Sequence, residues 1–298
     1  MFYPGAADLN DRTITVDSVL NDPTIIEHRI AELATPNLIV ETVFSQDNSP
    51  VQGGAVIYSE TTEKNFYTDN DVTQRMPGDE YTIVYRERPE AKLARVEDYG
   101  GKFPTSDEAR RRNQATDFDN DVRVLSNTLV RKLNQRAIET IEAARDAHKT
   151  NTLAIPGTGW KDVVLDGNPT TITAPADRPH SHIANLFAVA EQQELGIEYT
   201  KMLVSPAMKA TLRMVYGSDL GTMLEDFGLD LISTNFVADD LAYFVDPGKA
   251  GFVKYEEPLT VTTWRDEAHR QTWTQAYAMP VMGITTPSAI GVIEFSKE

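Results

Sequence analysis

The chain has 298 residues, enough for one large domain or two ordinary ones, and a formal net charge of −17 that excludes a surface-wide nucleic-acid binder, since phosphates attract a cationic excess. The absence of cysteine excludes disulfide bonds, thiolate metal sites and cysteine nucleophiles. No stretch approaches the ~18 apolar residues of a membrane span, and the first residues, Met1–Gly5, lack the basic and apolar regions of a secretory signal.

The first 50 residues predict an arm that packs on another surface. Apolar residues over 25–33 recur with helical spacing and predict one to two turns, which Asn21 and Asp22 precede as a helix start. Residues 13–16 alternate as a short strand does. These pieces are too small to bury a core of their own, so we expect them to lie on a neighbouring surface.

Residues 51–88 predict a projecting two-stranded ribbon. Residues 55–60 alternate between apolar and polar, and residues 81–86 alternate again as the return strand. A two-stranded ribbon is marginal in water by itself. We therefore expect strands over 51–63 and 79–88 that project roughly 35–45 Å and rest on a partner. Without such a partner, the side chains that would remain exposed to solvent are Tyr58, Ile83, Val84 and Tyr85.

Residues 104–150 predict a short helix followed by a very long one. Thr105 with Glu108 three residues later has the spacing of a capping box, and Thr116 begins the second helix. About 28 residues without Gly or Pro then predict a helix of roughly 42 Å. Its apolar face comprises Phe118, Val122, Leu125, Leu129, Leu133, Ala137, Ile141 and Ala144.

Residues 151–251 predict a separate α/β unit, and residues 252–298 are rich in strands. Ser181 is expected to begin one helix, and Ser205 followed by Pro206 begins another that Gly217 ends. Strands are expected at 199–204, 229–233, 242–245, 251–255, 259–264, 271–278 and 289–295.

Acidic residues at the start of the long helix resemble a calcium-binding loop. Asp117, Asp119 and Asp121 have the alternate spacing, but Val122 and Thr128 occupy the positions that require Gly and Glu. The pattern instead favours an acidic N-terminus that complements the helix dipole.

Other chemical motifs are incomplete. His180 and His182 have no third metal ligand nearby in the sequence, and Gly248–Lys249 lacks the remainder of a phosphate loop. The acidic pairs at 256–257 and 266–267 are interpreted as solvated strand ends. The sequence therefore predicts no catalytic, metal or cofactor site.

Arg110, Arg111 and Arg112 form the densest basic cluster. A contact with acidic residues of a neighbouring subunit is the favoured interpretation. A phosphate contact is the second, and a solvated cluster is the third.

Taken in order, these elements resemble the major capsid protein of tailed double-stranded-DNA bacteriophages, the Hong Kong 97 phage fold. Three stretches carry the resemblance: residues 91–144, Met202–Ala207, and residues 242–290, which are similar to capsid proteins of phages of actinobacteria. The resemblance implies an α+β fold. It places an N-arm at 1–50, an E-loop at 51–88, a P-domain strand and spine helix at 89–150, an A-domain at 151–251, and terminal strands that return to the P-domain at 252–298.

The resemblance also implies a structural protein and not an enzyme, without cofactors. It would self-assemble as pentamers and hexamers into an icosahedral virion shell around double-stranded DNA, in the host cytoplasm. The alternative is an encapsulin-type nanocompartment of the same fold, which differs in enclosing proteins. An acidic intracellular enzyme is a third hypothesis, and it would need a pocket of converging ionisable groups.

The implied partners are other copies of the chain, a portal and a separate scaffolding protein, because no fused scaffold precedes the arm; minor or decoration proteins are further candidates. Packaged DNA would touch the shell only weakly and non-specifically, and no membrane is involved. Some family members cross-link subunits between an E-loop lysine and an asparagine, aided by a glutamate. Lys64 is the only lysine of the ribbon and no partner is identified, so we expect non-covalent assembly. The expected interface residues are Tyr58, Lys64, Ile83, Tyr85, Arg86, Arg88, Arg110, Arg111 and Arg112.

Overall fold

The computed structural model describes residue 20 and residues 23–51, 53–89, 91–112, 115–148, 151–157, 159–167 and 170–296. The strand expected at 13–16 and the helix start at Asn21 and Asp22 lie outside the described residues. The α-helices are α2 (Pro23–Ala34), α3 (Val40–Val43), α4 (Glu63–Phe66), α5 (Asp107–Arg111), α6 (Ala115–His148), α7 (Pro179–Gln192), α8 (Pro206–Tyr216) and α9 (Leu220–Asp226).

The strands are β1 (Ser45–Gln46), β2 (Ala55–Ser59), β3 (Ala91–Arg95), β4 (Tyr99–Ser106), β5 (Thr152–Pro156), β6 (Lys201–Val204), β7 (Asp230–Ser233), β8 (Leu241–Val245), β9 (Gly251–Asp266), β10 (Gln271–Ile284) and β11 (Ile290–Ser296). Short 3₁₀ helices cover Thr35–Asn37, Trp160–Asp162, Pro175–Asp177, Gly217–Asp219 and Pro287–Ala289. No helix in these described ranges is both long enough and apolar enough to cross a membrane.

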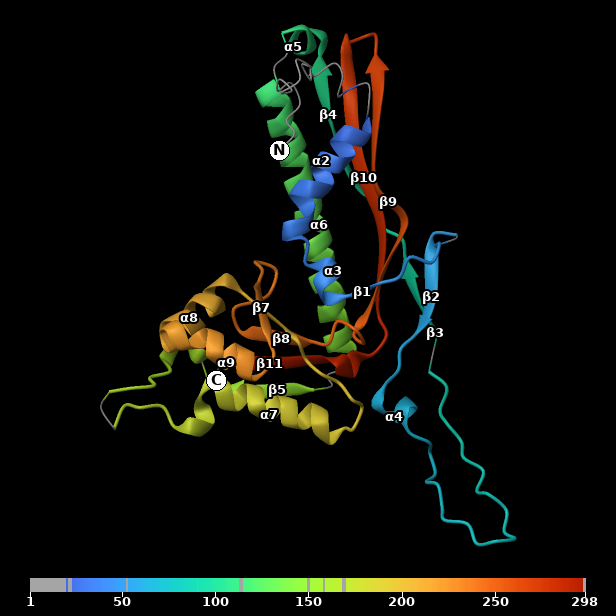
Figure 1. Cartoon of the computed structure of the whole chain (residues 1–298), viewed down its shortest axis with the longest axis vertical. Helices are drawn as coiled ribbons and strands as arrows, with labels where there is room; N and C mark the ends of the chain where they lie inside the picture. The colour runs from blue at the N-terminus through green and yellow to red at the C-terminus, as the bar shows by residue number, and fades with distance from the viewer. Residues whose placement is uncertain are drawn as a thin grey trace, which may run out of the picture.

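An elongated body is built on α6 and a four-stranded sheet with the order β1-β9-β10-β4 (Figure 1). The long helix is confirmed: α6 has 34 residues and is about 51 Å long. Its N-terminal half packs against α2, β4 and β10. As the spacing predicted, Phe118, Val122 and Leu129 are buried there, in a cluster with Val261 and Ala276 of the sheet.

A five-stranded sheet with the order β5-β11-β8-β6-β7 lies at the other end of α6. The central strand β8 is buried along its whole length because helices cover both of its faces. On one face, the Tyr243 hydroxyl accepts a hydrogen bond from Arg145 Nη1 of α6 at 3.3 Å. On the other, the ring of Phe244 lies 6.3 Å from that of Phe187 in α7. This double cover explains the uninterrupted apolar run of β8.

Two predicted caps are confirmed around α8. The Ser205 Oγ accepts a hydrogen bond from the backbone N–H of Met208 at 3.1 Å, with Pro206 in the first turn. Gly217 ends the helix with φ +57°, a backbone conformation that costs other residues more than glycine.

Three other helix starts differ from the prediction. The cap of α5 is Ser106, whose Oγ accepts a hydrogen bond from the Ala109 N–H at 3.2 Å, while Thr105 is buried within β4. α6 begins one residue before Thr116, and α7 begins after Arg178 instead of at Ser181. Neighbouring Ser and Thr residues offer competing caps, and the adjacent strand or loop decides which one is used.

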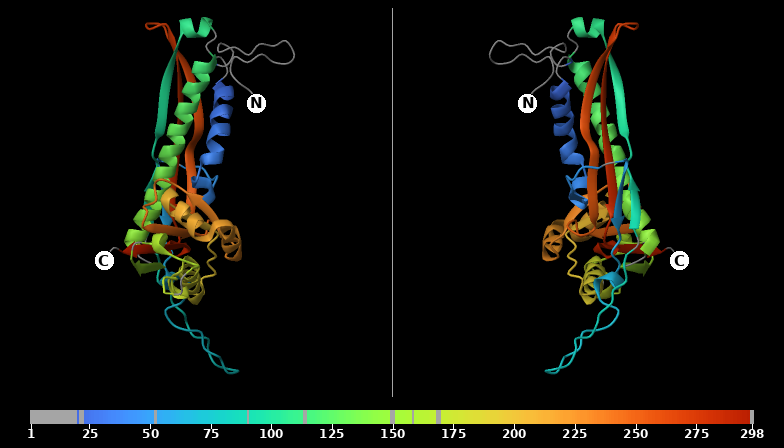
Figure 2. Two further views of the ribbon diagram at one scale, coloured as in Figure 1. Left: turned by 90° about the vertical axis from the view of Figure 1, so that its left-hand side faces the viewer. Right: turned by 90° about the vertical axis from the view of Figure 1, so that its right-hand side faces the viewer.

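The pairing of the ribbon also differs from the prediction. β2 pairs antiparallel with β3, whereas residues 81–86 form no strand. Packing decides which segment pairs with β2. The inner face of the β2–β3 ribbon lies against the body, where the ring of Tyr58 contacts that of Phe252 in β9. Residues 61–89 form a long loop beyond the ribbon, which projects away from the body in both side views (Figure 2). This loop is called the arm from here on, and it is distinct from the N-arm expected at residues 1–50.

The last strand lies in a different sheet from the one expected. β9 and β10 belong with the long helix, and β9 joins two predicted strands into one of 16 residues. β11 instead pairs with β5 and β8 in the five-stranded sheet. Burial fits this placement: residues 271–280 of β10 alternate between half-buried and buried, as suits a sheet covered on one face, whereas residues 290–293 of β11 are all buried.

Candidate subunit interfaces

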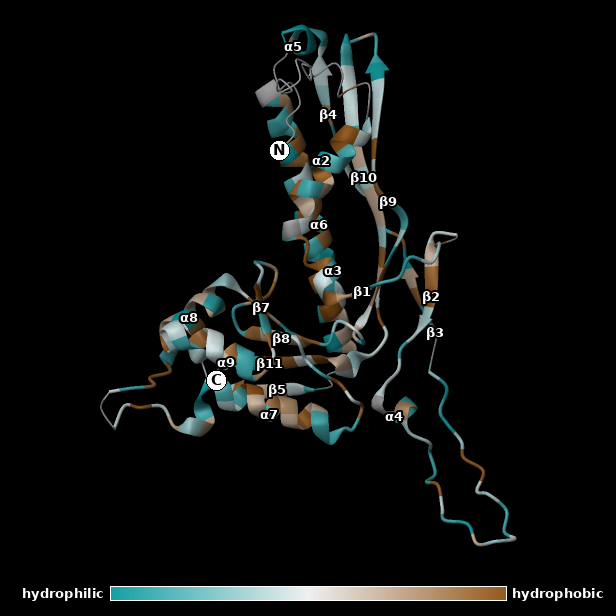
Figure 3. Ribbon diagram, viewed as in Figure 1, coloured by the Kyte–Doolittle hydropathy of each residue, from teal (hydrophilic) through white to brown (hydrophobic). Residues whose placement is uncertain are grey.

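Hydrophobic residues recur along the arm between hydrophilic ones (Figure 3), and their large apolar side chains are exposed to solvent. Tyr81, Ile83 and Tyr85 are 73%, 65% and 64% exposed. Others that are exposed in the arm are Phe66, Tyr67, Val72, Met76 and Val84. Soluble monomers seldom leave so many neighbouring apolar side chains in water. The arm therefore has the character of a contact surface.

The hydrogen bonds between the two legs of the arm come mostly from side chains, beside one backbone bond from the Asp69 N–H to the Tyr85 carbonyl at 2.9 Å. The Asn70 side chain accepts a bond from the Tyr85 N–H at 3.1 Å and donates one to the Ile83 carbonyl at 2.7 Å. The Tyr67 hydroxyl donates to the carbonyls of Gln193 and Glu194, 3.2 and 3.0 Å away. The arm is thus an open loop rather than a strand ladder.

The predicted arm residues lie where a neighbouring copy could reach them. Ile83, Tyr85, Arg86 and Arg88 are exposed on the returning leg, and Lys64 is exposed in α4. Their contacts with a second copy stay a prediction.

The expectation that Tyr58 would be exposed to solvent in the single subunit is wrong. Its ring packs edge-on against Phe252 at 5.5 Å, and this burial raises the pKa of Tyr58. Ile57 and Leu93, which pair across the ribbon, are 74% and 55% exposed instead. Strand alternation places Ile57 and Tyr58 on opposite faces, but the sequence carries no signal for which face packs inward.

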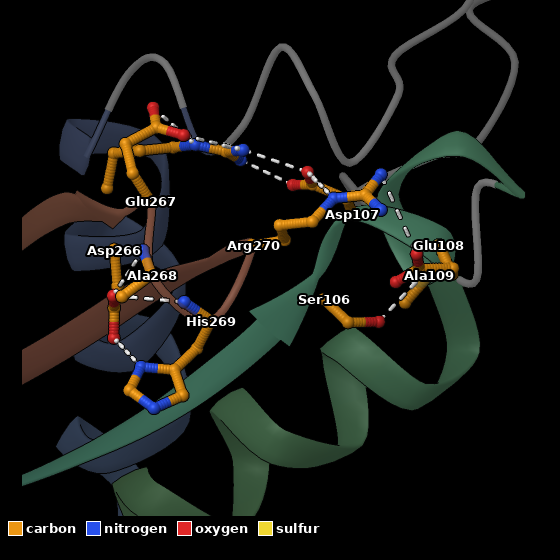
Figure 4. A network of polar contacts seen from close by, with 10 residues as sticks. Ser106, Asp107, Glu108, Ala109, Asp266, Glu267, Ala268, His269 and Arg270 are labelled. Atoms are coloured by element: carbon orange, nitrogen blue, oxygen red, sulfur yellow. Dashed lines mark hydrogen bonds and ion pairs between the residues drawn. The ribbon is translucent and has the colours of Figure 1, made fainter.

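The basic cluster lies at the far end of the body, where α5 meets the β9–β10 turn (Figure 4). The carboxylate of Asp107 is buried and pairs with both Nη atoms of Arg265, one of them 2.8 Å away. These hydrogen bonds from Arg265 hold the pKa of Asp107 below its ordinary value. The Arg270 side chain extends the network, with Nε 3.8 Å from Asp107 and Nη2 3.9 Å from Glu108.

Positive charge exceeds negative charge beside this network. Arg110 and Arg111 line an open cavity of about 450 Å³ together with Asp107 and Arg265, so its lining has three guanidinium groups and one carboxylate. Arg111 and Arg112 are exposed and Arg110 is half-buried. A local positive excess on a chain of net charge −17 is suited to an acidic partner surface.

The two neighbouring histidines have separate environments. His182 is buried, and its Nδ1 accepts a hydrogen bond from Trp160 Nε1 at 3.0 Å. The ring of His180 lies 4.8 Å from that of Phe227. Among the residues that the structure describes, no group of three or more His, Asp or Glu side chains could hold a metal ion.

His182 is expected to make the subunit less stable in acid. Burial lowers the pKa of His182, so the unfolded chain takes up a proton more readily than the folded one. Stability is therefore full above about pH 6.5 and falls as the pH drops below it. Calorimetric melting between about pH 8 and pH 5 should show this slope. His182→Gln should reduce it, and an unchanged slope in that variant would contradict the assignment.

Comparison with known proteins places these surfaces in context. A family model described as "Phage capsid protein" matches residues 89–293. Among solved structures, one from Microbacterium phage Oxtober96 has 12% identity and a TM-score of 0.59, covering 87% of this chain and 91% of that one. One from Mycobacterium phage Bobi has 10% identity and a TM-score of 0.58, with coverages of 88% and 91%.

A virus-like particle from Pyrococcus furiosus is similar as well. It has 13% identity and a TM-score of 0.57, covering 90% of this chain and 98% of that one. No curated protein sequence matches the chain. At such low identities the structural likeness shows the fold alone.

Proposed function

The chain belongs to the phage capsid protein family and has the Hong Kong 97-type fold, and from this we propose that it assembles as pentamers and hexamers into an icosahedral shell around double-stranded DNA. It is a capsid shell protein; the symmetry and the packaged DNA are parts of the proposal. The observation that carries it is the arm, whose exposed apolar side chains a second copy would cover.

The arm suits a contact in which each copy gives one surface and receives a different one. Such heterologous contacts close into rings when the rotation between neighbours allows it. Burial of Tyr81, Ile83 and Tyr85 would contribute about 1.5–3 kcal/mol per side chain. Repeated at every subunit, this attraction can offset the repulsion between copies that each carry −17.

Charge is expected to oppose assembly at low salt. At physiological ionic strength the Debye length is about 8 Å, so added salt screens the repulsion between acidic subunits. Local attraction must come from cationic groups that meet acidic ones, and Arg86, Arg88 and Arg110–Arg112 are the candidates. An acidic wall would also hold packaged DNA only weakly and non-specifically.

Charge reversal at the basic cluster should weaken assembly. Arg111→Glu replaces an exposed cation with an anion, so the subunit should fold while the yield of shells falls. Sedimentation and electron microscopy measure shells, and circular dichroism measures folding. Lys161→Glu is the matched control, since it makes the same charge change at an exposed residue of another element. Normal shells from Arg111→Glu would remove this cluster from the contacts.

Electron microscopy of the purified protein tests the proposal directly. Closed shells tens of nanometres across support it, and single subunits under all salt conditions would contradict it. The likeness to the Pyrococcus furiosus virus-like particle keeps an encapsulin-type shell as the second candidate. Shell contents distinguish the two, because one encloses DNA and the other a protein cargo.

The same proposal extends to the partners of the shell. It includes a portal, a separate scaffolding protein and assembly in the host cytoplasm, with minor or decoration proteins as further candidates. It assigns no catalytic step to the chain. Assembly should be non-covalent, so denaturing electrophoresis of shells should give one band at 33.2 kDa. A ladder of multiples would show cross-linking.

A further inference from the structure

Glu60 lies where the first leg of the arm leaves the body, directly after β2. The residue is only 8% exposed. A carboxylate is rarely buried to this extent unless it is paired, because desolvation of an unpaired charge is costly. The partners of Glu60 therefore indicate what this position holds together.

Glu60 contacts two side chains that come from other elements. Lys92 of β3 forms an ion pair with the Oε2 atom, and Nε2 of His148 lies 2.6 Å from the same oxygen. Lys92 stands just after the arm returns, and His148 is the last residue of α6. One carboxylate thus ties both legs of the arm to the end of the long helix. The backbone N–H of Thr61 adds a bond to the Thr285 carbonyl at 2.7 Å.

The root of the arm governs where its tip lies. The returning leg, residues 79–89, contains no helix and would span roughly 36 Å at ~3.3 Å per residue. A rotation of about 10° at its root would displace the tip by about 6 Å. A displacement of that size would misplace the apolar side chains on a neighbouring copy.

We propose that Glu60 is a positioning residue that sets the direction of the arm through its contacts with Lys92 and His148. The proposal rests on the proposed function, because the direction of the arm matters only where the arm meets another copy.

His148 gives the carboxylate a partner on the long helix, with its Nε2 atom 2.6 Å from Glu60 Oε2. His148 also lies at the negative, C-terminal end of α6. The groups around the pair are Lys92 from β3, the Tyr58 hydroxyl from β2, and Arg145 and Asp146, which pair with each other one turn earlier in α6.

Distance measurements on unassembled full-length subunits test the proposal. The chain has no cysteine, so cysteines introduced at Met76 in the arm and Lys132 on α6, both exposed, can be spin-labelled specifically. Pulsed electron paramagnetic resonance should give one narrow distance distribution between the two labels.

Three variants separate the contributions. Glu60→Gln should broaden the distribution, because the amide has no charge to pair with Lys92. His148→Ala should also broaden it, because the carboxylate loses its partner at the end of α6. Glu87→Gln is the matched control, since it makes the same change at an exposed carboxylate of the arm and should behave like the parent.

Two results would overturn the proposal: a distribution in Glu60→Gln as narrow as in the parent, or an equally narrow one in His148→Ala. If Glu60→Gln fails to fold, Lys92→Met carries the test, because it frees one leg from the carboxylate and should broaden the distribution. An unchanged distribution there would also overturn it. The measurement needs no shells, so a failure to assemble would reject the proposed function separately.

Discussion

Replacing Tyr81, Ile83 and Tyr85 together with serine is expected to abolish shells while leaving the subunit folded. All three side chains are at least 64% exposed, so the isolated subunit loses little packing and its stability should change by no more than about 0.5 kcal/mol per site. In a shell the lost burial is about 1.5–3 kcal/mol per side chain. Since about 1.4 kcal/mol is a tenfold change in affinity, each contact should weaken by roughly a thousandfold or more.

Sedimentation and negative-stain microscopy at matched protein concentration measure this loss, and thermal melting reports the fold. Gln74→Ser combined with Glu80→Ser is the matched control, because both residues are exposed and polar in the same arm. The control should assemble like the parent. Shells at parental yield from the triple variant would show that the arm does not hold copies together.

Leu129→Ala should destabilise the subunit by about 2–5 kcal/mol. Leu129 is 6% exposed in a cluster with Ile26 and Ile30 of α2 and Val261 of the sheet. Removal of its side chain leaves a cavity between three elements that cannot all move inward. Typical domains are stable by about 5–15 kcal/mol, so soluble yield should fall before shell geometry changes.

Urea denaturation monitored by circular dichroism measures this free energy of unfolding. Val124→Ala is the control on the same helix, because Val124 is 65% exposed and its truncation should cost less than about 0.5 kcal/mol. Equal stability of Leu129→Ala and the parent would show that this face of α6 is not buried.

Local patterns predicted the helices well. The three- and four-residue spacing between Phe118 and Ala144 identified α6, and Ser205–Pro206 and Gly217 marked both ends of α8. These signals work because helical hydrogen bonds and caps join residues close in sequence. The exposed arm side chains were also foreseeable, since two short strands cannot bury Ile83 or Tyr85 by themselves.

Long-range contacts were beyond the reach of such patterns. Alternation in β2 is the same whichever face packs inward, so the burial of Tyr58 and the exposure of Ile57 depend on where Phe252 lies. The pairing of Glu60 with His148 joins residues 88 positions apart. No pattern in the sequence around either residue predicts this contact.

From its residues alone, this protein is an acidic, cysteine-free chain with one very long amphipathic helix and apolar side chains that its own short strands cannot cover, because these properties depend on composition and local spacing. The tertiary structure decided which strands pair. It also placed β11 beside β8 instead of with the long helix, and it joined the arm to α6 through Glu60. Strand partners and buried ion pairs are selected by the surface that they bury together. This buried surface forms only when segments distant in sequence come into contact.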